Sequence, residues 1–171
     1  TVIRENAGSM KPGDVFALNA PYNGGTHLPD VTVITPVFDA DDKDILFYVG
    51  SRGHHADVGG RTPGSAPPDS RHIDEKGVLI NNFKLVDEGR FLEKETRVLL
   101  ASGTYPCRNI DDNMADLAAQ VAANETGVVE VRKMITQFGR SVVAAYMSHV
   151  QDNAEECVRR VISALKDGTY C

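Results

Sequence analysis

The sequence changes character near Pro106, and this change constrains the fold more than any other feature. Before Pro106 the chain is rich in glycine, proline and β-branched residues, whereas after it apolar residues recur every three or four positions. The first pattern is typical of short strands joined by turns, and the second of amphipathic helices. We therefore predict an α+β fold in a single domain, residues 1–171, in which a strand-and-loop part (1–105) precedes a helical part (106–171).

The strand-and-loop part contains short segments that are rich in β-branched and aromatic residues and are bounded by turn formers. They are residues 14–18, 31–38, 45–50, 78–86 and 90–95. Residues 39–44 and 87–89 are short enough to be hairpin turns, so we expect mainly antiparallel pairing. Residues 61–70 contain three prolines and a glycine, and we expect a rigid loop there.

The helical part predicts two helices in a C-terminal helical hairpin. Apolar residues follow helical spacing from Asp111 or Asp112 to Phe138, and Gly139 is expected to end the first helix. In the second helix, apolar or small residues alternate at intervals of four and three, which predicts a seam that packs on a neighbour. The seam residues are Val143, Met147, Val150, Ala154, Cys157, Val161 and Ala164.

Charge and hydropathy argue against two classes of partner. Eighteen Lys and Arg residues against 24 Asp and Glu residues give a net charge of −6, without a basic stripe, so nucleic-acid binding is not expected. The longest apolar runs, such as residues 45–49 and 98–101, fall far short of the roughly 20 residues that span a bilayer. We expect no membrane span and take the cytoplasm as the location.

The cysteines are predicted to be free thiols. Cys107, Cys157 and Cys171 form no C-x-x-C pair, and their odd number suits a reducing compartment. Cys107 lies in a predicted loop and is an alternative candidate for a nucleophile, although no histidine signature accompanies it.

Two loops concentrate residues that bind metals. The first contains a glycine pair, followed by His27 and Asp30 just before a predicted strand, and the second contains His54, His55 and Asp57 just after one. Imidazole and carboxylate groups held at strand ends are suitable ligands for Mn, Fe, Zn or Mg. The alternative is that these residues cap turns, lie at the surface or are satisfied in the core. Neither a phosphate-binding loop nor a serine nucleophile motif is present.

Four long words of the sequence resemble one family. They are NAPYNGGTHLPDVTVITPVF, ILFYVGSRGHHADVGGRTPGSAPPDSR, GVLINNFKLVDEGRF and YPCRNIDDNMADLAAQVAANETGV, in this order. Together they resemble the hydantoinase B/5-oxoprolinase family, and the resemblance spans nearly the whole chain. Members are much longer, so the resemblance implies that the chain is a fragment, truncated at both ends.

The resemblance implies an ATP-dependent system that opens cyclic amides such as 5-oxoproline or hydantoins. A hydantoinase A-type subunit, or a fused region, would use ATP to activate the substrate, the portion seen here would complete the reaction, and an oligomeric assembly is expected. A divalent metal (Mn, Zn or Fe) would be held by His27, Asp30 and one histidine of the His54–His55 pair, with His54 favoured.

Further roles are predicted around this metal. Asp57 is assigned as a fourth ligand or general base, and His55 as a catalytic residue. Arg52 and Arg108 are the candidates for binding a substrate carboxylate, since a guanidinium can hold a carboxylate through two hydrogen bonds. The alternative is that both are surface or helix-capping arginines. The family's usual serine is replaced by Cys107, which leaves the role of that position open.

Two other functions remain open at this point. One is a role in carboxylation, because the resemblance extends more distantly to the alpha subunit of acetone carboxylase. The other is a noncatalytic assembly module whose helical seam, residues 143–164, docks onto a hydantoinase A-type partner.

Overall fold

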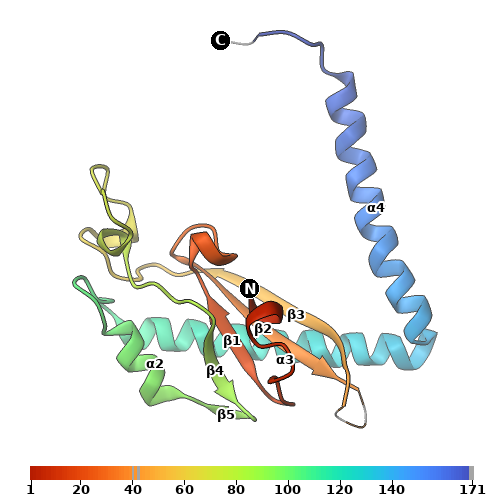
Figure 1. The fold of residues 1–171 in the computed structure, drawn as a ribbon, viewed down its shortest axis with the longest axis horizontal. Coiled ribbons are helices and arrows are strands. Elements are labelled where there is room, and N and C mark those ends of the chain that lie inside the picture. Colours follow the sequence, from red (N-terminus) through yellow and green to blue (C-terminus); the bar gives the residue numbers. More distant parts are fainter. Residues whose placement is uncertain (40, 42, 170–171) are drawn as a thin grey trace. The chain divides into compact units, whose positions relative to one another are not determined.

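The computed structural model describes residues 1–39, 41 and 43–169, and it contains a five-stranded antiparallel sheet (Figure 1). The strands lie in the order β3-β2-β1-β4-β5. Their bounds are β1 Val15–Leu18, β2 Asp30–Phe38, β3 Ile45–His54, β4 Phe83–Asp87 and β5 Arg90–Phe91. The three longer helices follow the strands along the chain, which confirms the α+β prediction, and all of the strand pairs are antiparallel, as predicted.

The helices are α1 Val2–Glu5, α2 Glu93–Leu100, α3 Ile110–Phe138 and α4 Arg140–Ala164, and three short 3₁₀ turns lie in the loops. The pair α3 and α4 confirms the predicted C-terminal helices. The chain forms two compact units, residues 1–128 and 129–171, so the division falls inside α3. Residues 110–128 of α3 therefore belong to the same unit as the strands, although they follow the change of sequence pattern near Pro106.

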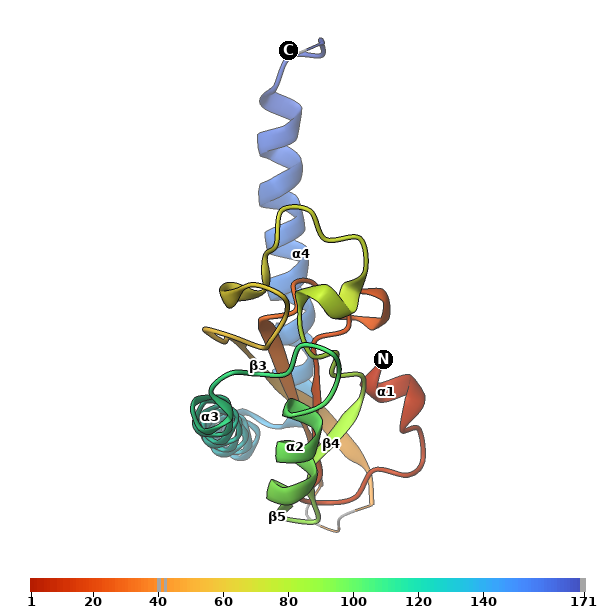
Figure 2. The same cartoon turned by 90° about the vertical axis from the view of Figure 1, so that its left-hand side faces the viewer.

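Alternate residues along each strand occupy the two faces of the sheet in the first unit. We call one of them the helix face, because α2 and residues 110–128 of α3 cover it (Figure 2). Val31 and Val33 of β2, both 0% exposed, lie on this face with Leu117 of α3. The main hydrophobic core therefore lies between the helix face and these two helices.

The opposite face of the sheet, which we call the outer face, is covered only in part. Val2 of α1 packs there with Phe16 and Leu18 of β1 in a small separate core. Figure 2 shows α1 on the side of the sheet opposite to α2 and α3. Further along, near the start of β2 and the end of β3, polar side chains occupy this face.

One predicted strand was wrong. Residues 90–95 form a strand only over Arg90–Phe91, and α2 begins at Glu93. Glu93 forms an i,i+4 ion pair with Arg97 at 3.1 Å, and the hydroxyl of Thr96 donates to the carbonyl of Leu92 at 2.6 Å. An acidic first turn and such a pair favour a helix over a strand.

The other strands differ from the prediction at their ends. The strand predicted over residues 78–86 begins only at Phe83 and continues to Asp87, because Asn82 has a φ of +48° and interrupts the extended backbone. The segment 45–50 continues to His54, because β3 pairs with β2 along its full length. The extension places His54 inside the sheet and no longer in a loop.

Both predicted hairpin turns join paired strands. Glu88 (φ +48°) and Gly89 (φ +86°) both have left-handed backbone angles, as the type I′ turns that suit strand twist require. In the turn of residues 39–44, the carboxylate of Asp39 accepts a hydrogen bond from the backbone N–H of Lys43 at 2.9 Å. Residues 40 and 42 lie outside the described residues.

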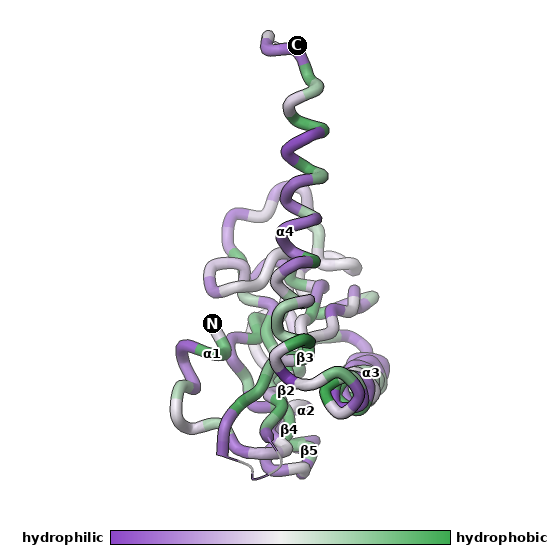
Figure 3. Tube along the Cα trace, turned by 90° about the vertical axis from the view of Figure 1, so that its right-hand side faces the viewer, coloured by the Kyte–Doolittle hydropathy of each residue, from purple (hydrophilic) through white to green (hydrophobic). Residues whose placement is uncertain are grey.

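In the second unit, residues 129–171, Gly139 (φ +85°) separates α3 from α4. The seam residues of α4 are mostly at the surface: within the described chain, Val143 is the one buried residue of this helix, whereas Val150 and Val161 are 67% and 65% exposed. Figure 3 shows hydrophobic residues recurring along α4 between hydrophilic ones. None of the helices that the structure describes has the length and hydropathy to cross a membrane.

Candidate metal site

The loop between β1 and β2 is held rigidly by backbone packing and a buried amide. A Cβ atom on Gly25 would lie 2.2 Å from the carbonyl oxygen of Asn19, so only glycine fits there. The Asn19 side chain is 0% exposed; it donates to the carbonyls of Leu28 and Val78 at 2.8 and 3.0 Å and accepts from the N–H of Ile80 at 2.7 Å. This loop therefore presents its end in a fixed conformation.

His27 and Asp30 lie at that end, next to the partner strand. The N–H of Asp30 donates to the carbonyl of His27 at 2.8 Å, which closes a tight turn between them. Asp30 then pairs across the sheet with His54, the last residue of β3. Opposed residues on two antiparallel strands share a face, so both side chains lie on the outer face.

The three side chains converge. Nδ1 of His54 lies 2.7 Å from Oδ1 of Asp30, and the rings of His27 and His54 stack with their centroids 5.7 Å apart and an interplanar angle of 26°. One ligand atom from each residue lies within 4.8 Å of the others. Imidazole nitrogen and carboxylate oxygen are the usual donors to Zn and related divalent ions, so this set fits a metal ion.

Electrostatics keep the carboxylate ionised. The hydrogen bond from His54 is the largest influence and lowers the pKa of Asp30 below its usual value; burial opposes it, and electrostatic interactions with His54, His27 and Arg52 lower the pKa further. Arg52 lies two residues before His54 on the same face, and its Nε donates to the hydroxyl of Thr32 at 2.9 Å. Arg52 therefore lies beside the cluster, and its substrate-binding role stays a prediction.

His55 lies on the opposite side of the sheet from His54. It is 2% exposed; its Nε2 is 3.0 Å from Oε1 of Gln120, and its Nδ1 is 3.1 Å from Nδ2 of Asn113. Both partners belong to α3. Of the two neighbouring histidines, the structure brings His54 into the cluster and packs His55 against the helix.

Asp57 and Arg108 pair with one another away from the three-residue cluster. Oδ1 of Asp57 accepts from the Arg108 guanidinium at 2.6 Å, and Oδ2 accepts from the N–H groups of Gly59 and Arg108 at 3.0 and 3.2 Å. The same guanidinium donates to the carbonyl of Gly60 at 2.6 Å. The catalytic role of Asp57 and the substrate-binding role of Arg108 stay predictions.

Cys107 is buried, and its burial raises the pKa of its thiol to about 11, with a further contribution from the Asp57 carboxylate. A thiol with such a pKa is protonated near neutral pH and is a poor nucleophile. Cys157 is a free, exposed cysteine, and Cys171 lies outside the described residues.

Sequence reasoning missed the amides that support the cluster. Asn113, Gln120 and Asn124 of α3 are buried and face the sheet. They lie seven and four residues apart, in line with the buried Leu117, so polar residues on the apolar stripe of a helix were the available signal. Asn19 begins the sequence word that contains Gly24 and Gly25, and no pattern in the sequence marked it as a supporting residue.

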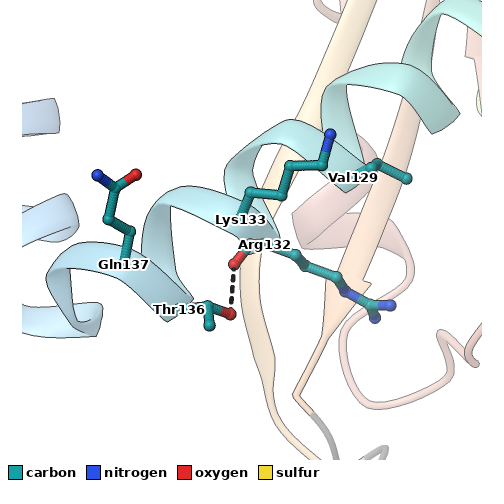
Figure 4. Close-up of a pocket in the computed structure, with 5 residues that line it drawn as sticks. All are labelled: Val129, Arg132, Lys133, Thr136 and Gln137. Atoms are coloured by element: carbon teal, nitrogen blue, oxygen red, sulfur yellow. Dashed lines mark hydrogen bonds between the residues drawn. The ribbon is translucent and has the colours of Figure 1, made fainter.

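Two hollows lie in the second unit, and neither is lined by a residue of the cluster. The smaller one is lined by Val129, Arg132, Lys133, Thr136 and Gln137, all on one helix, where the Thr136 hydroxyl donates to the carbonyl of Arg132 at 3.0 Å (Figure 4). The larger one, about 770 Å³, is lined mainly by apolar residues around Gly139, including Phe138, Tyr146 and Met147. Neither contains a pair of groups suited to acid–base or nucleophilic chemistry.

The fold and the cluster define a sheet-borne site suited to a divalent metal, and comparison with known proteins gives the family. The family model for hydantoinase B/oxoprolinase matches residues 1–171. The chain belongs to this family, as the four sequence words indicated.

Curated relatives are much longer than this chain. It is 47% identical over 165 residues to 5-oxoprolinase 1 of Arabidopsis thaliana, covering 92% of this chain and 13% of the relative. It is 46% identical to the 5-oxoprolinase of Dictyostelium discoideum, with 92% and 12% covered. A protein of a Pseudomonas species that is named as part of a D-/L-hydantoinase is 27% identical, with 99% and 28% covered. The chain thus corresponds to one part of each of these proteins.

Two solved structures share the fold. The ATP-dependent caprolactamase of Pseudomonas jessenii matches with a TM-score of 0.79 and 26% identity, over 98% of this chain and 28% of that one. A nucleotide-free acetone carboxylase matches with a TM-score of 0.67 and 21% identity, over 85% and 18%. The second likeness shows the fold alone.

Proposed function

We propose that this chain is part of an ATP-dependent cyclic-amide hydrolase, in which His27, Asp30 and His54 hold a divalent metal. The convergence of their ligand atoms within 4.8 Å carries the proposal. The names of the relatives, 5-oxoprolinase, hydantoinase and caprolactamase, support a cyclic amide as the substrate class, with 5-oxoproline or a hydantoin as the first candidates.

Groups on the outer face support this proposal. A divalent ion bound there would act as a Lewis acid toward an amide carbonyl and toward water. Asp30, ionised and hydrogen-bonded to His54, keeps the three donors close together. Arg52 is the proposed group for a substrate carboxylate, because it is exposed and lies on the same face as the cluster.

Asp57 and Arg108 receive a different role in this proposal. Each satisfies the other, and together they hold the backbone at Gly59 and Gly60. We assign the pair to fixing the loop that follows β3. The use of ATP is assigned to a hydantoinase A-type subunit or fused region, since the sequence has no phosphate-binding loop motif.

An assembly role is the second candidate function, and the exposed seam of α4 favours it. Seven seam residues keep alternating spacings of four and three, yet Val143 alone of the described α4 residues is buried. Such a stripe is stable when another helix covers it. In this role α4 would dock onto the remainder of the ATP-dependent assembly, with or without a metal on the outer face.

Metal binding by the purified chain tests the main proposal. We expect one Mn²⁺ or Zn²⁺ per chain by titration calorimetry, and a loss of affinity of at least about 100-fold in His27→Ala, because a ligand is removed. His72→Ala, which replaces an exposed histidine outside the cluster, is the matched control and should bind as the parent chain does.

Either of two results would contradict the proposal. A folded His27→Ala chain with unchanged affinity would show that the metal binds elsewhere. A parent chain that binds neither metal, although its fold is intact, would leave the assembly role as the better account.

A further inference from the structure

A closed ring of contacts links both faces of the sheet at the metal cluster. On the helix face, Nε2 of Gln120 donates to the carbonyl of Val31 at 2.9 Å, and Oε1 of Gln120 lies 3.0 Å from Nε2 of His55. On the outer face, His54 is hydrogen-bonded to Asp30. Since Val31 follows Asp30 and His55 follows His54, the ring passes through two peptide units and closes on itself.

A second contact reinforces this ring. The backbone N–H of His55 donates to the carbonyl of Pro29 at 2.8 Å. The residues on both sides of Asp30 are therefore both connected to His55. The carbonyl of Pro29 accepts from the backbone N–H of His55, and the carbonyl of Val31 accepts from Gln120, which contacts the His55 ring. Gly53 makes the close approach possible, because a Cβ there would lie 3.1 Å from Cδ of Gln120.

Backbone carbonyls determine the orientation of both amides. The carbonyl of Val31 only accepts, so the group of Gln120 that faces it is the NH₂ group, and its oxygen faces His55. Likewise the carbonyl of Asp57, 2.8 Å away, selects the NH₂ group of Asn113, which also faces Nδ1 of His55. His55 must then accept at Nδ1 and donate from Nε2, which defines one neutral tautomer.

Other groups near this ring do not alter the assignment. The nearest carboxylate is that of Asp116, with Oδ2 3.9 Å from Nδ1 of His55, beyond hydrogen-bond distance. Among the described residues, Oδ1 of Asn113 has no hydrogen-bond partner, which is the expected result when its NH₂ group takes both acceptors.

We propose that Gln120, assisted by Asn113, is a positioning residue for the metal ligands and acts through His55. This inference rests on the proposed function for the identity of the ligands. Gln120 and His55 touch neither substrate nor metal; they hold the peptides at Asp30 and His54 so that the outer-face donors keep their spacing.

The first test uses NMR to detect the ring of contacts through Gln120 and His55 in the metal-free chain. Long-range proton–nitrogen NMR of the 171-residue chain should show His55 protonated at Nε2, and nuclear Overhauser effects should connect the stacked rings of His27 and His54. In Gln120→Leu we expect these effects to weaken or vanish. A His55 ring protonated at Nδ1 in the parent chain would overturn the proposal.

Asn124→Leu is the matched control. Asn124 is buried on the same face of α3 one turn further on, and it donates to the carbonyl of Val33 and the hydroxyl of Thr35 at 3.1 Å. It therefore shares the structural role of an amide bonded to β2 and has no hydrogen bond to His55. Both variants should lower the melting temperature, and only Gln120→Leu should disturb the outer face.

The second test uses Co²⁺ as a spectroscopic probe of the same site. We expect Gln120→Leu to weaken Co²⁺ binding about tenfold and to change its visible spectrum, whereas Asn124→Leu leaves both unchanged. Equal effects of the two variants would reduce Gln120 to a structural residue. If Gln120→Leu does not fold, Asn113→Ala replaces it, with a weaker effect in the same direction, and no effect would overturn the proposal.

The two proposals fail in different ways. A parent chain that binds no metal contradicts the proposed function. The nuclear Overhauser effects between the imidazole rings of His27 and His54 still test the positioning role in that case. A parent chain that binds metal, with Gln120→Leu binding as tightly, contradicts the positioning role alone.

Discussion

Where β2 begins and β3 ends, polar side chains are buried on the helix face of the sheet and mostly exposed on the outer face. On the helix face His55, Gln120 and Asn113 are buried, and hydrogen bonds within the protein fix their orientation. On the outer face His27 and His54 are exposed and converge with Asp30. Polar groups buried on one face thus specify the backbone, and the other face is left with groups that are ordered but still accessible to a ligand.

The largest change in the free energy of unfolding is expected for a substitution on the helix face. Leu117 is 2% exposed in the main core, so Leu117→Ala should lower the free energy of unfolding by about 3 kcal/mol, through lost burial and the cavity left behind. Denaturant unfolding measures this change. Val98→Ala on α2, where the side chain is 71% exposed, should change it by less than about 0.5 kcal/mol. Metal affinity of the folded Leu117→Ala chain should stay unchanged.

A smaller effect separates the neighbouring histidines. His55→Ala leaves the buried amides of Gln120 and Asn113 without their partner, and we expect a loss of about 2 kcal/mol in the free energy of unfolding. His54→Ala removes a side chain that is 64% exposed, and should cost less than about 0.5 kcal/mol while abolishing metal binding. Equal costs in urea unfolding would break the distinction between the two faces.

The smallest effect concerns pH and the outer face. The hydrogen bond from His54 lowers the pKa of Asp30, so the folded state binds this proton more weakly than the unfolded state does. The stability contributed by the Asp30 carboxylate is therefore present above its unfolded pKa, about 3.9, and is lost as the pH falls through its lower folded pKa. Unfolding of the parent chain and of Asp30→Asn should differ at pH 6 and converge in acid. A difference that grows in acid would contradict the lowered pKa.

The sequence was sufficient for the architecture because its patterns are local. The periodicity of residues 111–138 and 143–164 predicted α3 and α4 almost to their ends. The segment 90–95 was predicted wrongly because Phe91 and Leu92 precede an acidic helix start, and tertiary context decides such short segments. The boundary between the compact units, inside α3, has no local signal, because it depends on which half of the helix meets the sheet.

The site was predictable in part. His27, Asp30 and His54 were selected from their loops, and the structure brings all three together. A sequence does not give strand register, and register alone decides that Asp30 faces His54, whereas Asp57 lies beyond the end of β3 and pairs with Arg108. The supporting residues Gln120 and Asn113 lie on a helix about 60 residues away along the chain, where only three-dimensional packing relates them to His55.

Gly53 also has a consequence for errors in folding. If β3 slipped by one residue against β2, Arg52 or His54 would take its place opposite Gln120, where a Cβ would lie 3.1 Å from Cδ of Gln120, so that the amide would have to shift. A mispaired hairpin would therefore pack less well against α3. We expect docking of α3 to favour the register in which His54, and not His55, is in reach of a ligand.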